Sequence, residues 1–213
     1  MKQYLKKITP LYLLYLYWLK LKRKLNDRLF IPGYETKRKT IIDLAKKYNC
    51  TDVFIETGTY MGDTVDYVKN EFAELFSIEL SGELAEKARK RFQNNSKINI
   101  IQGDSTTKLP EILSAINSNC TFWLDGHYSS EFQLGDSYIV TGKGDKETPI
   151  AEELLHIASK PFQKHLILID DARLFNGKND YPQKNMLKEF VKNHFPNHLF
   201  QIKKDIIRIL PKQ

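Results

Sequence analysis

The chain has 213 residues, a length that suits one domain with a short appendage and excludes two independent catalytic domains. Hydrophobic residues make up 41% of it and charged residues 28%, which is enough apolar material for a core and argues against global disorder. The formal net charge is +7, a balance that alone suggests a nucleic acid, an anionic membrane or a phosphorylated substrate as partner.

The positive charge is concentrated near the N-terminus. Residues 1–40 hold eleven Lys or Arg and two acids, a net charge of +9, whereas the other 173 residues hold 22 basic and 24 acidic residues, a net charge of −2. A nearly neutral body gives little support for the basic groove of a dedicated nucleic-acid-binding protein. Nucleic acid is therefore not an expected partner.

The N-terminal residues 1–36 are predicted to form a basic, aromatic helical segment, followed by a catalytic domain over residues 37–213. The uncharged residues 8–19 are too few to cross a bilayer, which needs about 20, and no cleavage site of a secretory signal follows them. Two alternatives stay open: the segment lies on an anionic membrane surface through residues 1–28, or it packs on the domain or on a second copy in a homo-oligomer. We expect a cytoplasmic protein, with any peripheral attachment at the inner membrane face.

The body alternates short β-rich apolar runs with helical patterns. The predicted strands are 52–56, 75–79, 98–102, 120–125 and 165–170, and the predicted helices are 62–70, 83–93, 107–117, 149–160 and 182–194. Residues 198–203 and 206–210 predict a hairpin. We expect a Rossmann-like, doubly wound α/β domain whose seven-stranded sheet has five parallel strands plus a C-terminal antiparallel hairpin, with helices on both faces. Residues 126–147 are expected to form a long irregular loop with a function.

Two cysteines, Cys50 and Cys120, each precede an apolar run. No CxxC pattern and no His/Cys cluster at metal spacing is present in the sequence, so a disulfide framework is excluded. We expect two buried, reduced thiols at the starts of strands.

The carboxyl ends of the predicted strands hold the candidate site, because ligands of doubly wound sheets bind there. The first strand runs into ETGTYMGDT, residues 56–64. A dinucleotide fingerprint needs a glycine where Tyr60 stands, so NAD and FAD are disfavoured, whereas a nucleoside without phosphates is permitted. The segment resembles the first motif of S-adenosylmethionine-dependent methyltransferases. The resemblance implies contacts to that cofactor by the acid near the methionine ammonium, the loop glycines and two threonines: Glu56, Gly58, Gly62, Thr59 and Thr64.

Further acids follow the next two strands. Glu79 ends the second strand, where an acid would accept hydrogen bonds from both ribose hydroxyls. Asp104 and Ser105 follow the third strand in a segment that resembles the family's third motif, in which the acid reaches the adenine amine. Each acid alone is also compatible with a helix start or a turn. Their placement after successive strands favours a site for S-adenosylmethionine.

Three more acids, Asp125, Asp170 and Asp171, follow the fourth and fifth strands. Adjacent strands would bring them together, and carboxylate oxygens suit Mg²⁺ or another divalent cation. The arrangement is similar to that of metal-dependent O-methyltransferases of the catechol and sugar types. In such a site the ion stabilises the alkoxide of a substrate hydroxyl, and His127 beside Asp125 is the candidate catalytic base. The alternatives are a turn without metal for the aspartate pair and a structural role for His127.

The resemblance therefore implies an O-methyltransferase that uses S-adenosylmethionine and a divalent metal, with a hydroxyl of a sugar, a glycan or a related polyol as the acceptor. The alternatives are a methyltransferase acting on protein or nucleic acid, and a non-catalytic, membrane-associated module that binds S-adenosylmethionine.

Overall fold

The computed structural model describes residues 32–126, 131–134, 137–140, 148–160 and 164–212. Most of the predicted N-terminal segment and His127 lie outside these residues. Within the described part, no helix combines the length and the apolar character needed to cross a membrane. The first described helix begins at Tyr34, so the predicted boundary between residues 36 and 37 falls inside a helix that belongs to the body.

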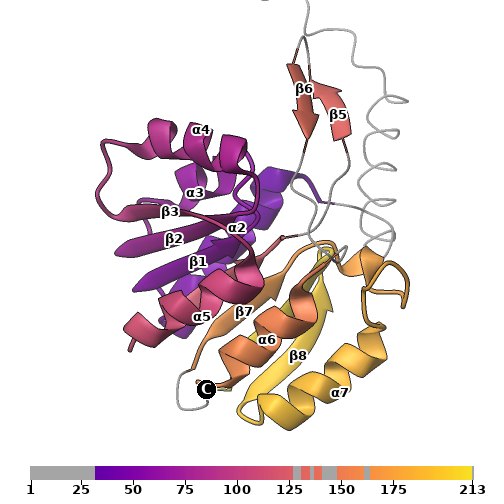
Figure 1. The fold of residues 1–213 in the computed structure, drawn as a ribbon. Coiled ribbons are helices and arrows are strands. Elements are labelled where there is room, and N and C mark those ends of the chain that lie inside the picture. Colours follow the sequence, from indigo (N-terminus) through magenta and orange to yellow (C-terminus); the bar gives the residue numbers. More distant parts are fainter. Residues whose placement is uncertain (1–31, 127–130, 135–136, 141–147, 161–163, 213) are drawn as a thin grey trace, which may run out of the picture.

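A seven-stranded sheet in the order β3-β2-β1-β4-β7-β9-β8 forms the centre of the molecule (Figure 1). The first five strands in this order pair in parallel, and β9 runs antiparallel to both β7 and β8. The strands are β1 (Val53–Thr57), β2 (Glu74–Glu79), β3 (Ile98–Gln102), β4 (Cys120–Leu124), β7 (Leu166–Ile169), β8 (His198–Lys203) and β9 (Ile206–Pro211). The predicted sheet, with its parallel strands and its C-terminal hairpin, is confirmed.

Helices cover both faces of this sheet (Figure 1). One face carries α2 (Tyr34–Tyr48), α3 (Asp63–Val68) and α4 (Gly82–Phe92), and the other carries α5 (Ser105–Ala115), α6 (Ile150–Ala158) and α7 (Lys184–His194). The central strands are buried on both faces, so their side chains belong alternately to two hydrophobic clusters. Phe54 belongs to the cluster beneath α2, and its neighbour Ile55 belongs to the cluster beneath α5 and α6.

Both cysteines are buried and free, as predicted. Cys120 begins β4, and Cys50 lies shortly before β1. Burial raises the pKa of the Cys50 thiol to about 11 and that of the Cys120 thiol to about 12. The thiols therefore stay protonated and serve as small apolar groups in the core.

The stretch after β4, which we expected to be irregular, contains two short strands. β5 (Glu131–Leu134) and β6 (Ser137–Val140) pair in an antiparallel sheet of their own, which stands apart from the main sheet in Figure 1. The expectation of an irregular loop is wrong for these residues. Gly135 and Asp136 stand between the two runs, and a Gly-Asp pair between β-rich runs is a hairpin signal.

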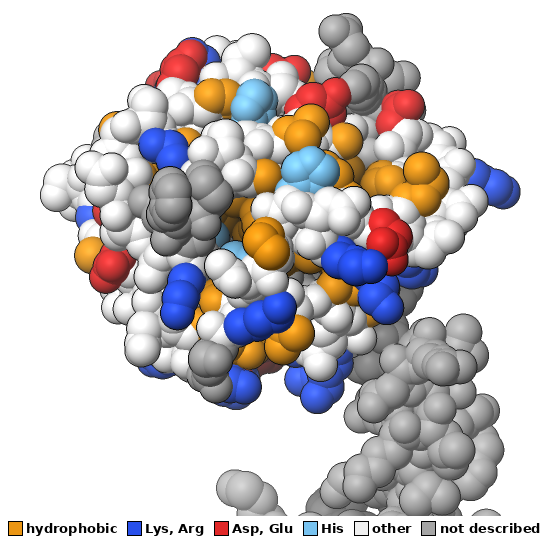
Figure 2. Space-filling view, turned by 90° about the horizontal axis from the view of Figure 1, so that it is seen from below, with side chains coloured by type: hydrophobic (Ala, Val, Ile, Leu, Met, Phe, Trp, Pro, Cys, Tyr) orange, Lys and Arg blue, Asp and Glu red, His pale blue; other side chains and the backbone are white. Residues whose placement is uncertain are grey.

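The surface seen from below in Figure 2 mixes different kinds of side chain. Lys and Arg side chains are separated by hydrophobic and uncharged ones, and acidic side chains lie toward the edge of this face. This distribution agrees with the nearly neutral charge of the body and does not form a continuous basic stripe.

Candidate functional site

The two-residue period of the strands gathers acids on one face of the sheet. Phe54, Trp123 and Leu168 all belong to the hydrophobic cluster beneath α2 and α3. Because side chains alternate, the residue two positions later along each chain is directed to the same face. These residues are Glu56, Asp125 and Asp170. The sheet register supports this placement, since Leu124 of β4 pairs with Ile169 of β7 directly before the two aspartates.

Glu56 is a buried carboxyl group, with only 2% of its surface exposed. The Ser77 hydroxyl donates a hydrogen bond to its Oε2 atom over 2.5 Å. Burial raises the pKa of Glu56 to about 8, although the Ser77 hydrogen bond and the charge of Arg38 oppose this shift. A carboxyl group in such surroundings ionises readily only when a cation is bound beside it.

The loop after β1 depends on its two glycines. Gly58 has φ of +88°, and a Cβ atom there would lie 2.6 Å from the carbonyl oxygen of Asp125. Gly62 has φ of +77° and precedes α3, where a Cβ atom would lie 2.7 Å from the ring of Phe92. The resemblance to methyltransferases implies that these glycines permit the close approach of a cofactor. The structure shows that they first allow the loop to pack against β4 and α4.

Glu79 is held in one orientation at the end of β2. Its Oε2 atom accepts the backbone N–H of Tyr60 over 2.8 Å, and its Oε1 atom accepts the backbone N–H of Ser81 over 2.9 Å. Burial raises the pKa of Glu79, and the backbone hydrogen bonds oppose the shift. Thr59, another predicted contact, is buried with its hydroxyl 2.7 Å from the Ser77 hydroxyl, so its side chain supports the loop from inside.

Asp104 is the N-cap of α5. Its Oδ1 atom accepts hydrogen bonds from the backbone N–H and the hydroxyl of Thr106, over 2.8 and 2.7 Å. The helix-start alternative for this residue is therefore confirmed, and it leaves Oδ2 outside the cap. Ser105 is buried in the first turn of α5, whereas Thr64 is half-buried in the first turn of α3.

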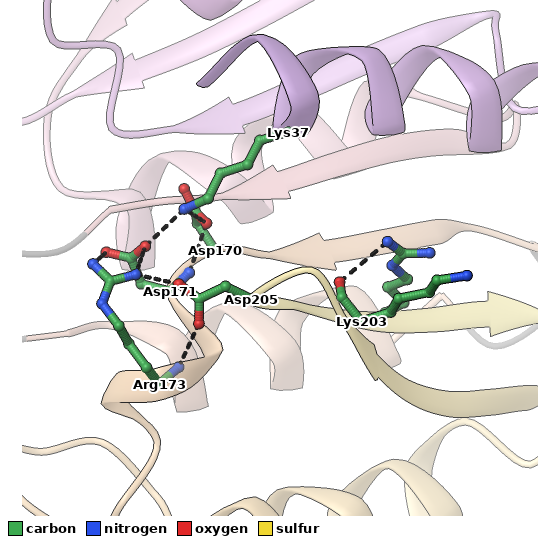
Figure 3. Close-up of polar contacts among 7 residues, drawn as sticks. Lys37, Asp170, Asp171, Arg173, Lys203 and Asp205 are labelled. Atoms are coloured by element: carbon green, nitrogen blue, oxygen red, sulfur yellow. Dashed lines mark hydrogen bonds and ion pairs between the residues drawn. The ribbon is translucent and has the colours of Figure 1, made fainter. Parts of the chain in front are cut away.

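A charged cluster joins α2 to the end of β7 (Figure 3). The Lys37 ammonium reaches down from α2 and donates hydrogen bonds to Asp170 Oδ1 and, over 2.8 Å, to Asp171 Oδ1. Arg173 donates to both carboxylate oxygens of Asp171, over 2.6 and 2.9 Å, and also pairs with Asp205 in the β8–β9 turn. Lys37 is 4% exposed, so this lysine is a buried part of the site.

Lys37, Asp171 and Arg173 stabilise one another's charges, whereas burial and the neighbouring acids disfavour the charge of Asp170. Burial opposes the charge of Lys37, but its attraction to Asp170 and its hydrogen bonds to both aspartates outweigh burial and raise the pKa of its ammonium. Burial also opposes ionisation of Asp171, yet hydrogen bonds from Lys37 and Arg173 lower the pKa of this carboxyl group. Burial and the charge of Asp125 raise the pKa of Asp170 to about 7. Asp125 therefore lies close enough to act on Asp170 electrostatically.

The expected divalent metal at Asp125, Asp170 and Asp171 does not fit this arrangement. Among the residues that the structure describes, no group of three or more His, Cys, Asp or Glu side chains is placed to hold a metal ion. The Lys37 ammonium already contacts two of the three expected ligands, and a divalent ion between the same carboxylates would be repelled by it. The metal is thus unsupported, and the proposed base His127 stays a prediction.

No role for Lys37 is predicted from the sequence, where this residue is only one of the eleven basic residues in the charge of residues 1–40. A signal was present in the helical period. Lys37, Ile41 and Ala45 lie four residues apart on one side of α2, and all three are buried. A lysine on an apolar stripe indicates a buried cation with a nearby acid.

A small pocket opens beside the ends of β4 and β7. Asp125, Asp170, Glu153 and Tyr181 belong to its lining, together with apolar side chains. Burial raises the pKa of Glu153 to about 7, against an opposing hydrogen bond from Ser105. The pocket combines apolar walls with acids, and its volume of about 10 Å³ has room for a single water molecule.

Several solved methyltransferases share this fold. The O-methyltransferase TomG from Streptomyces achromogenes, solved with S-adenosylmethionine, matches with a TM-score of 0.59 and 13% identity, over 90% of this chain and 86% of TomG. An O-methyltransferase from Bacillus cereus, solved with S-adenosylhomocysteine, gives a TM-score of 0.53 and 16% identity, over 90% of this chain and 88% of that chain. The 23S rRNA methyltransferase ErmE gives 0.51 and 14%, over 86% of this chain and 70% of ErmE.

These likenesses establish the fold, which is the Rossmann-like fold of class I methyltransferases, with a C-terminal antiparallel hairpin. Comparisons with protein-family models and with curated proteins find no match.

Proposed function

We propose that this protein is an S-adenosylmethionine-dependent O-methyltransferase. The observation that carries the proposal is the set of acids at the ends of three successive strands, Glu56, Glu79 and Asp104, in a fold shared with TomG, which was solved with this cofactor. S-adenosylmethionine carries a sulfonium and an ammonium cation, so a set of acids at the strand ends suits it. Tyr60, where a dinucleotide site needs glycine, disfavours NAD.

Each acid has a distinct proposed role. Glu79, fixed by two backbone N–H groups, accepts the two ribose hydroxyls. The buried Glu56 pairs with the methionine ammonium, a cation that favours its ionised form. Asp104 accepts a hydrogen bond from the adenine amine through Oδ2, since Oδ1 caps α5.

The proposed acceptor is a hydroxyl group of a sugar, a glycan or a related polyol. Methyl transfer forms an O–CH₃ bond while the S–CH₃ bond breaks, which leaves S-adenosylhomocysteine and sends the hydroxyl proton to a base. TomG and the Bacillus cereus protein are O-methyltransferases, whereas ErmE acts on rRNA, so the acceptor class needs a direct test.

The test is transfer of a labelled methyl group from S-adenosylmethionine to a panel of sugars, polyols and glycans, with RNA and a protein mixture as comparison acceptors. We expect label in an alkali-stable ether on the hydroxylated acceptors. Label found only in RNA or protein, or no transfer to any acceptor, would contradict the proposed function.

A further inference from the structure

We propose that Lys37 is a built-in cation: its ammonium occupies the position between the strand-end aspartates that would otherwise take a divalent ion, so methyl transfer by this protein needs no metal. The statement about metal occupancy rests on the geometry of the cluster alone. The statement about transfer rests on the proposed function as well.

The position of Lys37 is fixed by α2. Its side chain leaves the helix on the same stripe as Ile41 and Ala45, which are fully buried beneath the helix. The ammonium therefore enters the site from a packed element and not from a mobile surface. Surface lysines are mostly exposed, whereas Lys37 is 4% exposed and contacts two carboxylates.

The acids of the cluster are already supplied with cationic donors. Asp170 Oδ1 accepts hydrogen bonds from the Lys37 ammonium and from the backbone N–H of Asp171. Both carboxylate oxygens of Asp171 accept hydrogen bonds from Arg173, and Oδ1 also accepts one from Lys37. Buried carboxylates close to one another repel unless a cation relieves them, and here the chain itself provides the cations.

The backbone of this segment is shaped around the same contacts. Asp171 has φ of +53°, a left-handed conformation that is uncommon for a residue with a side chain. In this conformation its carboxylate meets Lys37 from α2 and Arg173 from the following turn (Figure 3). We therefore assign Lys37 a positioning role: it holds the aspartates in place beside the pocket that Asp125 and Asp170 line.

The experiment compares Mn²⁺ binding by the full chain and by Lys37→Ala, in the presence of S-adenosylmethionine, with electron paramagnetic resonance as the readout. The wild-type protein should bind no stoichiometric Mn²⁺. Lys37→Ala removes the ammonium from Asp170 and Asp171 and should bind Mn²⁺ at least ten-fold more tightly than the wild type. Lys39→Ala is the matched control, because Lys39 lies on the exposed side of α2 and pairs only with Asp43 in the structure described.

Methyl transfer provides the second readout. Chelation by EDTA should leave wild-type turnover unchanged, and Lys37→Ala should lower kcat more than it changes the affinity for S-adenosylmethionine, with Lys37→Arg recovering part of the loss. Three results would overturn the proposal. The first is stoichiometric Mn²⁺ binding by the wild type, and the second is loss of wild-type turnover on chelation. The third is equal Mn²⁺ affinity of the wild type and a folded Lys37→Ala variant.

The wild-type Mn²⁺ measurement decides the question even where Lys37→Ala fails to fold. A chain that binds no S-adenosylmethionine would refute the proposed function, whereas the Mn²⁺ comparison without cofactor would still test the occupancy of the cluster.

Discussion

Replacing Gly58 with alanine tests the loop between β1 and α3, which precedes two of the proposed cofactor contacts. The new Cβ atom would lie 2.6 Å from the carbonyl oxygen of Asp125 and 2.9 Å from its carbonyl carbon. Both atoms belong to the backbone that continues β4, so no side-chain rotation relieves the contact. The left-handed conformation at φ of +88° adds about 1–2 kcal/mol for any residue with a Cβ atom.

Overpacking of a tight contact typically costs about 1–3 kcal/mol, so the free energy of unfolding should fall by about 2–5 kcal/mol in Gly58→Ala. Urea unfolding measures this loss. A shift of the loop would also move the Tyr60 N–H that orients Glu79, so equilibrium dialysis should show at least about ten-fold weaker binding of S-adenosylmethionine, equivalent to about 1.4 kcal/mol.

The matched control is Gly82→Ala, at the start of α4. A Cβ atom at Gly82 would meet no heavy atom within 4 Å, and alanine favours helix, so this variant should be at least as stable as the wild type. Suppose that the free energy of unfolding of Gly58→Ala differed from that of the wild type by less than about 0.5 kcal/mol, and that the variant bound the cofactor equally well. The packing of the loop against β4 would then contribute little to stability or binding.

Three further predictions concern single side chains. Glu79→Gln replaces a charged hydrogen-bond acceptor by a neutral amide and should weaken S-adenosylmethionine binding by about 1.5–3 kcal/mol in calorimetry. The control Glu83→Gln, at an exposed residue, should leave binding unchanged. Equal affinities of Glu79→Gln and the wild type would show that Glu79 is not part of the cofactor site. Asp104→Ala should lower the free energy of unfolding by about 0.5–2 kcal/mol, because α5 loses its N-cap, and a smaller change in urea unfolding would argue against the cap. Burial lowers the pKa of His165 to about 4, so the unfolded chain takes up a proton below its ordinary value of 6.5 while the folded chain does not. The contribution of His165 to stability should therefore fall by about 3 kcal/mol between pH 6.5 and pH 4, whereas Glu56, Glu153 and Asp170, whose pKa values are raised, contribute in the opposite direction. His165→Asn, which keeps an acceptor for the Cys120 N–H, should gain stability relative to the wild type by about that amount over this interval; a constant difference between the two proteins would contradict the assignment.

The sheet was predictable because its strands are buried on both faces. Runs such as residues 120–124 and 166–169 are almost wholly apolar, and each ends at an acid that marks the carboxyl end of a parallel strand. The same acids indicated the candidate site. The two-residue period then explains why Glu56, Asp125 and Asp170 lie on one face, although that inference needs the sheet order as well.

The contacts across the molecule were not predictable from local patterns. Lys37 meets Asp170 across 133 positions of sequence, so its charge alone, one of eleven basic charges in residues 1–40, does not indicate its partner. The resemblance assigns Gly58 to the close approach of the cofactor, whereas a Cβ atom there would lie nearest to the backbone after β4. Asp104 fits both a cofactor contact and a helix cap, and only the hydrogen bond to the Thr106 N–H identifies the cap.

Titration calorimetry of S-adenosylmethionine into the full chain tests the central proposal most directly. The acids at the carboxyl ends of β1, β2 and β3 predict one bound cofactor per chain, and Tyr60 predicts that NAD gives no heat under the same conditions. A well-folded chain that binds no S-adenosylmethionine would contradict the account.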